Sequence, residues 1–290
     1  MTTISDTPET ADHPSVEPER ALSLSYYTLP ELDVLQTVAV AAATGCRHLG
    51  LRLLGGQPGG GETKLLSSPT LRAKLRVAMS AHSVSALDAN TVRLIDSTVT
   101  AAYLPFFDVA AELGARHVLA TADDPEPERL VDNLLALCEI AAARELTIDL
   151  EFVPWLQLSS IDAAARLIRQ CQHPALGISV DALHYFRSHG TPEQLAQLPP
   201  EWFRYAQLCD IDSPEPPLSR QAYIDEATQE RLPPGEGIID LTGLLRALPP
   251  GIPLALEIPQ VTLSQTEPAE VRVKRAVAAT RQVLRAAGAK

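Results

Sequence analysis

The stretch LTIDLEFVPWLQLSSIDAAARLIRQCQHPALGISVDAL (146–183) contains two short apolar runs separated by a helical segment. The runs, LTIDLEF (146–152) and LGISVDAL (176–183), are rich in aliphatic residues and are typical of buried strands. Between them, a serine pair (159–160) precedes IDAAARLIRQC as an N-terminal cap, and Pro174 ends the helical pattern. The stretch therefore predicts a strand, a helix and a second strand, which is the βα repeat of α/β proteins.

The same alternation extends along the rest of the chain. The starts of successive strand-like runs lie 27 to 47 residues apart, which leaves room for one helix and two loops in each interval. The six further runs are ALSLSYYTL (21–29), HLGLRLL (48–54), VSALDAN (84–90), HVLATA (117–122), YAQLCDI (205–211) and IPLALEI (252–258). Eight such repeats predict a single closed (β/α)8 TIM barrel of the α/β class. A doubly wound open sheet is the structural alternative, but no GxGxxG or GxxxxGK[ST] motif follows an early strand.

Proline and glycine bound several of the expected helices, in line with their preference for helix starts and helix ends. One helix is expected at 30–44, closed by Gly45, and the next is expected to open at Pro69. Two longer helices are expected at 127–145 and 268–288. These boundaries support the same βα alternation.

The 290 residues, of which 46% are hydrophobic and 21% charged, have the composition of a soluble globular protein. Since barrels commonly reach about 250 residues as one unit, we expect one barrel over residues 21–290. The segment 1–20 is polar and rich in proline and acidic residues, so we expect a flexible tail there. The four cysteines show no CxxC spacing. We therefore expect neither a disulfide framework nor a zinc knuckle, and a cytoplasmic protein.

The formal net charge of −12 and the pI near 5.0 argue against two classes of partner. An acidic surface repels phosphate backbones and anionic membranes, so we expect neither nucleic acid nor membrane as a partner. No apolar stretch approaches the ~20 residues that span a bilayer, and the amino terminus lacks the basic and apolar regions of a secretory signal. The expected partner is a small-molecule substrate.

Polar side chains stand at the ends of the last four expected strands, at Glu151, Asp181, Gln207 and Glu257. Because parallel barrel strands are buried on both faces, a charge there is costly unless it is paired or bound to metal. Active sites of these barrels form at the carboxyl ends of the strands, so the three carboxylates are expected to converge. A divalent cation relieves their repulsion, and oxygen ligands favour Mn2+ or Mg2+ over zinc.

Each of these positions also has a simpler interpretation. A single strand-end carboxylate such as Glu151 can instead cap a helix or pair with arginine. Gln207 could bond to neighbouring backbone, and Asp210 competes with it as a metal ligand. His184, three residues after Asp181, could bind a substrate oxygen or cap the following helix. The repetition of acids at the ends of strands five, six and eight favours the metal site.

Three further features bear on substrate binding. Arg52 ends HLGLR on the second strand and could bind a carboxylate or phosphate, or pair with an acid at the mouth of the barrel. Trp155 is one of several aromatic residues near strand ends that could line the pocket or serve ordinary packing. The long loop over 213–237 is expected to reach over the mouth and to influence substrate choice.

At these residues the chain resembles the xylose isomerase-like barrel superfamily of sugar isomerases, epimerases and related dehydratases. In that family the fifth strand ends in Glu, the sixth in Asp with His three residues on, the seventh carries His or Gln, and the eighth ends in Glu. The segments PGEGIID (234–240) and FDVAAELGARHV (107–118) also resemble family segments. The resemblance covers the chain from Ala21 to the last helix. It implies that Glu151 and Glu257 both bind the metal and act as base and acid.

Two departures from the family pattern concern the reaction. Epimerases of the family often carry an Arg six residues after the strand-seven ligand, where this chain has Ser213; Arg220 could substitute from the loop. Dehydroshikimate dehydratases typically have a His two residues beyond the strand-five Glu, where this chain has Val153. The second departure argues mildly against that dehydratase.

The expected function is that of a divalent-metal-dependent isomerase or epimerase of a small keto-sugar or related polyhydroxy carbonyl compound. The cation would polarise the carbonyl and an adjacent hydroxyl, and so stabilise the enediolate formed when a proton is removed by Glu151 or Glu257. The main alternative is a dehydratase of a keto-polyol or keto-cyclitol, which begins with the same proton abstraction. A noncatalytic barrel subunit is the other alternative.

The three-zinc endonucleases of the superfamily need more His ligands than this chain has, and a basic groove that this acidic chain does not offer. The resemblance also suggests a homo-oligomer.

Overall fold

The structure, a computed structural model, describes residues 20–55 and 61–288. Eight parallel strands follow one another in sequence order around a closed barrel, and the last strand pairs with the first. The strands are β1 (Leu22–Leu24), β2 (His48–Arg52), β3 (Ser85–Leu94), β4 (His117–Ala122), β5 (Thr147–Glu151), β6 (Leu176–Asp181), β7 (Phe203–Leu208) and β8 (Leu254–Leu256). The predicted (β/α)8 barrel is confirmed, and the open doubly wound sheet is excluded.

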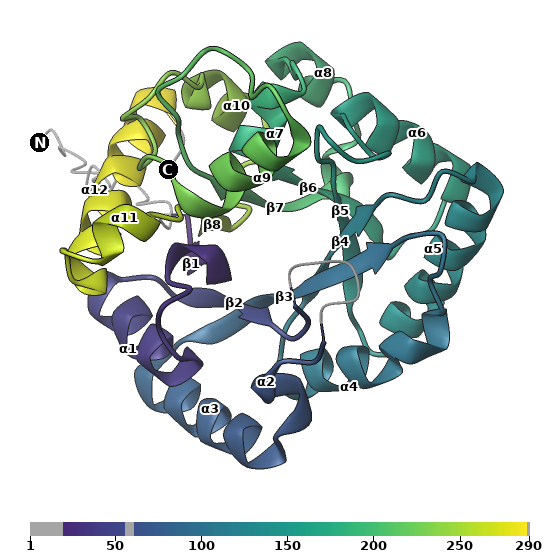
Figure 1. Cartoon of the computed structure of the whole chain (residues 1–290), viewed down its shortest axis with the longest axis horizontal. Coiled ribbons are helices and arrows are strands. Elements are labelled where there is room, and N and C mark those ends of the chain that lie inside the picture. Colours follow the sequence, from purple (N-terminus) through teal and green to yellow (C-terminus); the bar gives the residue numbers. More distant parts are fainter. Residues whose placement is uncertain (1–19, 56–60, 289–290) are drawn as a thin grey trace, which may run out of the picture.

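Helices form a ring around the strands (Figure 1). The longer ones are α1 (Val34–Thr44), α3 (Pro69–His82), α4 (Leu104–Glu112), α5 (Pro127–Ala142), α6 (Ile161–Cys171), α9 (Arg220–Gln229), α10 (Leu241–Ala247) and α12 (Ala269–Ala287). Four helices are shorter: α2 (Lys64–Ser67), α7 (Ala182–Arg187), α8 (Pro192–Ala196) and α11 (Val261–Ser264). The predicted loop over 213–237 contains α9, which the sequence did not predict.

Local capping explains where the helices begin and end. Ser160 accepts a backbone hydrogen bond at the start of α6, as the serine pair predicts. The predicted start of the first helix at Pro30 is wrong, because Asp33 and Gln36 form a capping box that starts α1 later. Gly45 ends α1 in the left-handed conformation (φ 81°), which glycine adopts without strain.

Polar groups at the amino-terminal ends of the strands form a network that stabilises the barrel. Asp149 accepts a hydrogen bond from the Thr147 hydroxyl (2.7 Å) and pairs with Arg204 (2.9 Å). The His117 ring lies 3.3 Å from the same carboxylate. Next along the interior is a small apolar cluster of Leu87, Leu119, Tyr205 and Ala255. Asp149 is thus paired at this end of the barrel, whereas active sites of these barrels form at the carboxyl ends of the strands.

The predicted tail over 1–20 lies outside the described residues except for Arg20, so the division into tail and barrel stays a prediction. All four cysteines are buried and unbridged. None of the helices within 20–55 and 61–288 is long and apolar enough to cross a membrane.

Candidate metal centre

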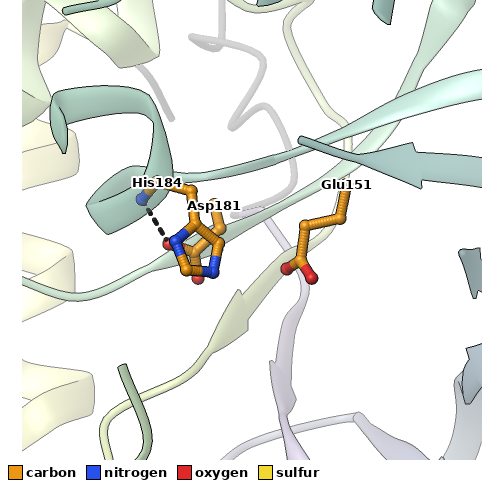
Figure 2. Close-up of side chains that lie close together, drawn as sticks. All are labelled: Glu151, Asp181 and His184. Carbon is orange, nitrogen blue, oxygen red and sulfur yellow. Dashed lines mark hydrogen bonds between the residues drawn. The ribbon is translucent and has the colours of Figure 1, made fainter. Parts of the chain in front are cut away.

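Two acids and one histidine meet where β5 and β6 end. Glu151 is the last residue of β5, Asp181 is the last residue of β6, and His184 lies in the first turn of α7. One donor atom from each of the three lies within 4.8 Å of the others, and all three residues are buried. In Figure 2 the Glu151 carboxylate and the His184 ring point to the same side as the Asp181 carboxylate. Asp181 Oδ1 also accepts the His184 backbone N–H (3.0 Å), so Asp181 caps α7 and fixes where the imidazole points.

Glu257 directly follows β8 and reaches the same cluster from the other side of the barrel. Its Oε1 accepts a hydrogen bond from the Ser25 hydroxyl (2.7 Å), and its Oε2 lies 3.4 Å from Arg231 Nη1. The same nitrogen lies 2.7 Å from Asp181 Oδ2. A guanidinium therefore stands between two of the three carboxylates. Sequence reasoning missed Arg231, because it lies in a loop beyond α9 where no motif or periodicity marks it.

The structure distinguishes the two strand-seven candidates. Gln207 is buried and pairs with Asp181 across β6 and β7. Its side-chain oxygen accepts a hydrogen bond from the Ser179 hydroxyl at 3.4 Å, which leaves it weakly held. The Asp210 carboxylate instead accepts backbone N–H groups from the glycine-rich turn at 235–239 and from Ile211. The Asp210 carboxylate is thus hydrogen-bonded to the turn, and Gln207 remains the candidate metal ligand from strand seven.

Burial and mutual repulsion perturb the acids of the cluster. Burial, together with Glu257 and Asp181, raises the pKa of Glu151 well above its usual value. The pKa of Glu257 is raised to about 8, chiefly by burial, with Asp181 adding to the effect. Burial would also raise the pKa of Asp181, but Arg231 and His184 outweigh it and hold that pKa below its usual value. A further positive charge at this cluster would favour the ionised forms of Glu151 and Glu257.

His184 supplies a specific sign of a missing partner. Burial lowers its pKa to about 4, so the imidazole is neutral near pH 7 and can act as a ligand. Its Nδ1 atom is buried and has no hydrogen-bond partner in the part of the chain that the structure describes. A buried polar atom without a partner is costly. One carboxylate oxygen each from Glu151 and Asp181 and one His184 ring nitrogen lie close enough together to hold a divalent cation. Glu257 and Gln207 stay predicted ligands.

A cavity of about 120 Å³ adjoins the cluster. Glu151, His184, Arg231 and Glu257 line it, together with all three other residues predicted to bind substrate: Arg52, Trp155 and Arg220. Arg93, which sequence reasoning did not single out, is a further lining residue. Neither Asp181 nor Gln207 is among the lining residues, so a molecule in the cavity faces Glu151 and Glu257.

The predicted substrate-binding residues have different surroundings. The Arg52 guanidinium lies over the rings of Tyr26 and Tyr27, 4.9 and 4.7 Å from their centroids. The Trp155 ring packs edge-on against the His184 ring, with centroids 5.2 Å apart. Arg220, at the start of α9, pairs with Asp123 at 3.0 Å, and both side chains are partly exposed. Arg52 and Trp155 are thus held by packing, whereas the Arg220 ion pair can exchange with a ligand.

The sequence profile of the family described as xylose isomerase-like TIM barrel matches residues 38–283. Two curated relatives, both 3-dehydroshikimate dehydratases, are similar to about half of the chain. The protein from Pseudomonas aeruginosa PAO1 is 32% identical over 145 residues, which are 48% of this chain and 22% of that protein. The protein from Pseudomonas putida KT2440 is 30% identical over 161 residues, or 52% and 25%. The chain thus aligns with about a quarter of the length of these relatives.

Solved structures with low sequence identity share the fold. The IolI protein with a bound zinc atom has a TM-score of 0.73 at 17% identity, over 92% of this chain and 97% of that one. A fusion of a xylose isomerase-like TIM barrel with a 4-hydroxyphenylpyruvate dioxygenase has a TM-score of 0.78 at 20% identity, over 93% and 43%. The D-allulose 3-epimerase of a Methylomonas species has a TM-score of 0.68 at 14% identity, over 92% and 99%. At these identities the likeness concerns the fold alone.

Proposed function

Because the chain belongs to the xylose isomerase-like TIM barrel family, we propose that it is a metal-dependent lyase that removes water from a small carboxylated polyhydroxy ketone. The first substrate to test is 3-dehydroshikimate, since two curated relatives are dehydratases of that compound. The observation that carries the proposal is the set of arginines in the cavity that also contains Glu151 and Glu257.

The size and charge of the cavity favour a small anion. The cavity of about 120 Å³ is smaller than the ~150 Å³ that accommodates benzene, so it limits the substrate to about one six-membered ring, only partly enclosed. Arg52 and Arg220 both line this space, as does Asp123, the partner of Arg220. A neutral ketose has no formal charge to pair with the arginines, whereas a carboxylate accepts two parallel hydrogen bonds from one guanidinium. A hydroxylated cyclic keto acid such as 3-dehydroshikimate meets both conditions.

The proposed chemistry divides between the two glutamates that line the cavity. A bound divalent cation would polarise the ketone and stabilise the negative charge next to it. Glu151 takes the proton from the carbon beside the ketone, and the electron pair of that C–H bond forms the new double bond. As the C–O bond on the next carbon breaks, Glu257 gives its proton to the leaving hydroxyl, and water departs.

Isomerisation or epimerisation of a keto-sugar is the second candidate, and Val153 favours it. This buried residue lines the cavity where dehydroshikimate dehydratases typically carry histidine, so an imidazole is missing from that position. Epimerisation needs only the two carboxylates, since the proton is returned to the opposite face of the same carbon.

One set of incubations separates the two reactions. The protein loaded with Mn2+ or Mg2+ is incubated with 3-dehydroshikimate, and the ultraviolet absorption of the aromatic dihydroxybenzoate reports the loss of water. A panel of ketoses and one keto-cyclitol is incubated in D2O and followed by NMR. We expect water loss from the carboxylated ketone and none in excess chelator. Deuterium uptake into a neutral ketose, without water loss from 3-dehydroshikimate, would contradict the proposal and favour the epimerase. Inactivity on every compound would favour a noncatalytic barrel.

A further inference from the structure

We propose that Arg231 is an internal counter-cation, which shares Asp181 and Glu257 with the metal and thereby limits how tightly the metal binds. The inference rests on the metal site of the proposed function. It assigns a role to a residue that contributes no metal ligand and that no sequence motif marks.

The contacts of the guanidinium define this role. Arg231 Nη1 lies 2.7 Å from Asp181 Oδ2 and 3.4 Å from Glu257 Oε2, and the Arg231 side chain is only 2% exposed. The other Glu257 oxygen, Oε1, accepts a hydrogen bond from the Ser25 hydroxyl. The two carboxylates that a cation would need from β6 and β8 are therefore already neutralised in part by a buried positive charge.

The backbone around Arg231 prevents the guanidinium from moving far when a metal binds. The Arg231 N–H donates to the Pro259 carbonyl (2.8 Å), and its Nε–H donates to the Ala227 carbonyl (3.0 Å). Isolated antiparallel bridges lie on both sides, from Glu230 to Gln260 and from Leu232 to Asp210. These bonds tie the segment after α9 to the strand ends. We therefore infer that the guanidinium stays beside the cation rather than leaving the site.

Arg231 and a bound cation would share the same carboxylates. Glu151, Asp181 and Glu257 together bring three negative charges when ionised; Arg231 lies beside Asp181 and Glu257, and Arg93 favours the ionised form of Glu151. Arg231 and a divalent cation would repel each other over a short distance in a medium of low polarity. Removal of the guanidinium should therefore tighten metal binding and destabilise the metal-free protein, whose carboxylates lose their counter-charge.

The test compares Arg231→Gln with Arg187→Gln in metal-free protein titrated with Mn2+ by calorimetry and unfolded by heat with and without Mn2+. Arg187 is a matched control, because it is equally buried (2% exposed) and also anchors α9, through Glu226. We expect Arg231→Gln to bind Mn2+ about tenfold or more tightly than wild type. Its Tm without metal should be lower and its gain in Tm on Mn2+ addition larger. Arg187→Gln should lower the Tm in both states and keep the wild-type Kd.

Two further variants keep the test decisive. Arg231→Lys retains the charge and should keep a Kd close to that of wild type; tightening equal to that of Arg231→Gln would overturn the proposal. Arg231→Met, which retains the apolar stem, replaces Arg231→Gln if the latter does not fold.

The outcomes also separate this inference from the proposed function. An unchanged or weaker Kd in Arg231→Gln, with metal bound by wild type, overturns the inference alone. Mn2+ binding by Arg231→Gln but not by wild type supports the inference and contradicts the proposed function. Binding by neither protein overturns both.

Discussion

A substrate in the cavity can contact Glu151 and Glu257 but not Asp181. Both glutamates line the cavity, whereas Asp181 lies behind them with its two oxygens engaged by Arg231 and the His184 backbone. In the reaction that we propose, this difference favours the glutamates for the proton transfers and Asp181 as a metal ligand.

Replacing Glu257 by Gln should lower kcat by about 100-fold or more, because the amide cannot supply the proton, while the protein stays folded. The readout is the steady-state rate of water loss, with circular dichroism as the check on folding. Glu139→Gln, on an exposed position of α5 (side chain 78% exposed), is the matched control and should be unchanged. A Glu257→Gln variant with more than a tenth of wild-type kcat would contradict the assigned role.

Arg52→Gln should raise KM for a carboxylated substrate by about tenfold or more and change kcat little, because a charge-assisted hydrogen bond is worth about 1.5–3 kcal/mol. The comparison is with a substrate analogue in which the carboxylate is an amide, for which the variant and wild type should differ little. An equal loss on both compounds would mean that Arg52 only supports the Tyr26 and Tyr27 rings beneath it.

The polar residues of the strand ends could be predicted because a charged side chain in a buried strand conflicts with its surroundings, and that conflict is visible in the sequence. The choice between Gln207 and Asp210 could not be predicted from the sequence, since it depends on the turn at 235–239, whose N–H groups donate to Asp210. The role of Arg231 could not be predicted either. Its position follows from two bridges between segments far apart in the chain.

The helix α9 is the element that connects the cavity to the surface. Ile224, Ala227 and Thr228 on one side of it line the cavity, and the Tyr223 ring packs against Trp155 with centroids 5.7 Å apart. The sequence analysis predicted a loop over this segment. Its helical form comes from packing over the site and from the Ser219 cap, which accepts the Ala222 N–H.

Arg220 and Asp123 at the start of α9 provide a test of whether Arg220 binds substrate. Because the ion pair is partly exposed, either Arg220→Gln or Asp123→Asn should change the free energy of unfolding by less than about 1 kcal/mol. If Arg220 binds the substrate, Arg220→Gln raises KM several-fold, whereas Asp123→Asn frees the guanidinium and leaves KM equal or lower. Equal KM increases in both variants would show that the pair only holds α9 in place.

Across the whole barrel, charged groups at the two ends of the strands have different partners. At the amino-terminal ends Asp149 is paired with Arg204 and hydrogen-bonded to Thr147. At the carboxyl ends Asp181 and Glu257 share the Arg231 guanidinium, and burial, with repulsion from these two acids, raises the pKa of Glu151. The closed topology could be predicted from eight repeats, because each strand and helix pattern is local. The registers of the strands bring Asp181 opposite Gln207. They depend on closure of the barrel, so they could not be predicted from the sequence.

The metal-free protein should lose stability as the pH rises from about 6 to about 8.5. Glu257 holds its proton with a pKa of about 8 when folded, against an ordinary value of 4.5. Between these values the folded state binds more protons than the unfolded state, so the free energy of unfolding falls with rising pH. Calorimetric melts should show this fall in chelator and a smaller one with saturating Mn2+. Metal-free Glu257→Gln should show a weaker dependence, and an unchanged slope in that variant would contradict the assignment.

Calorimetric titration of the metal-free protein with Mn2+ tests most directly whether the strand-end carboxylates hold a divalent cation. We expect one Mn2+ per chain for wild type and for Asp123→Asn, which changes an acid at the mouth outside the cluster. In Asp181→Asn we expect binding to be lost or weakened by about 10-fold or more, because a charged ligand and the partner of Arg231 are removed together. Absence of binding in wild type, or equal affinity in Asp181→Asn, would contradict the claim.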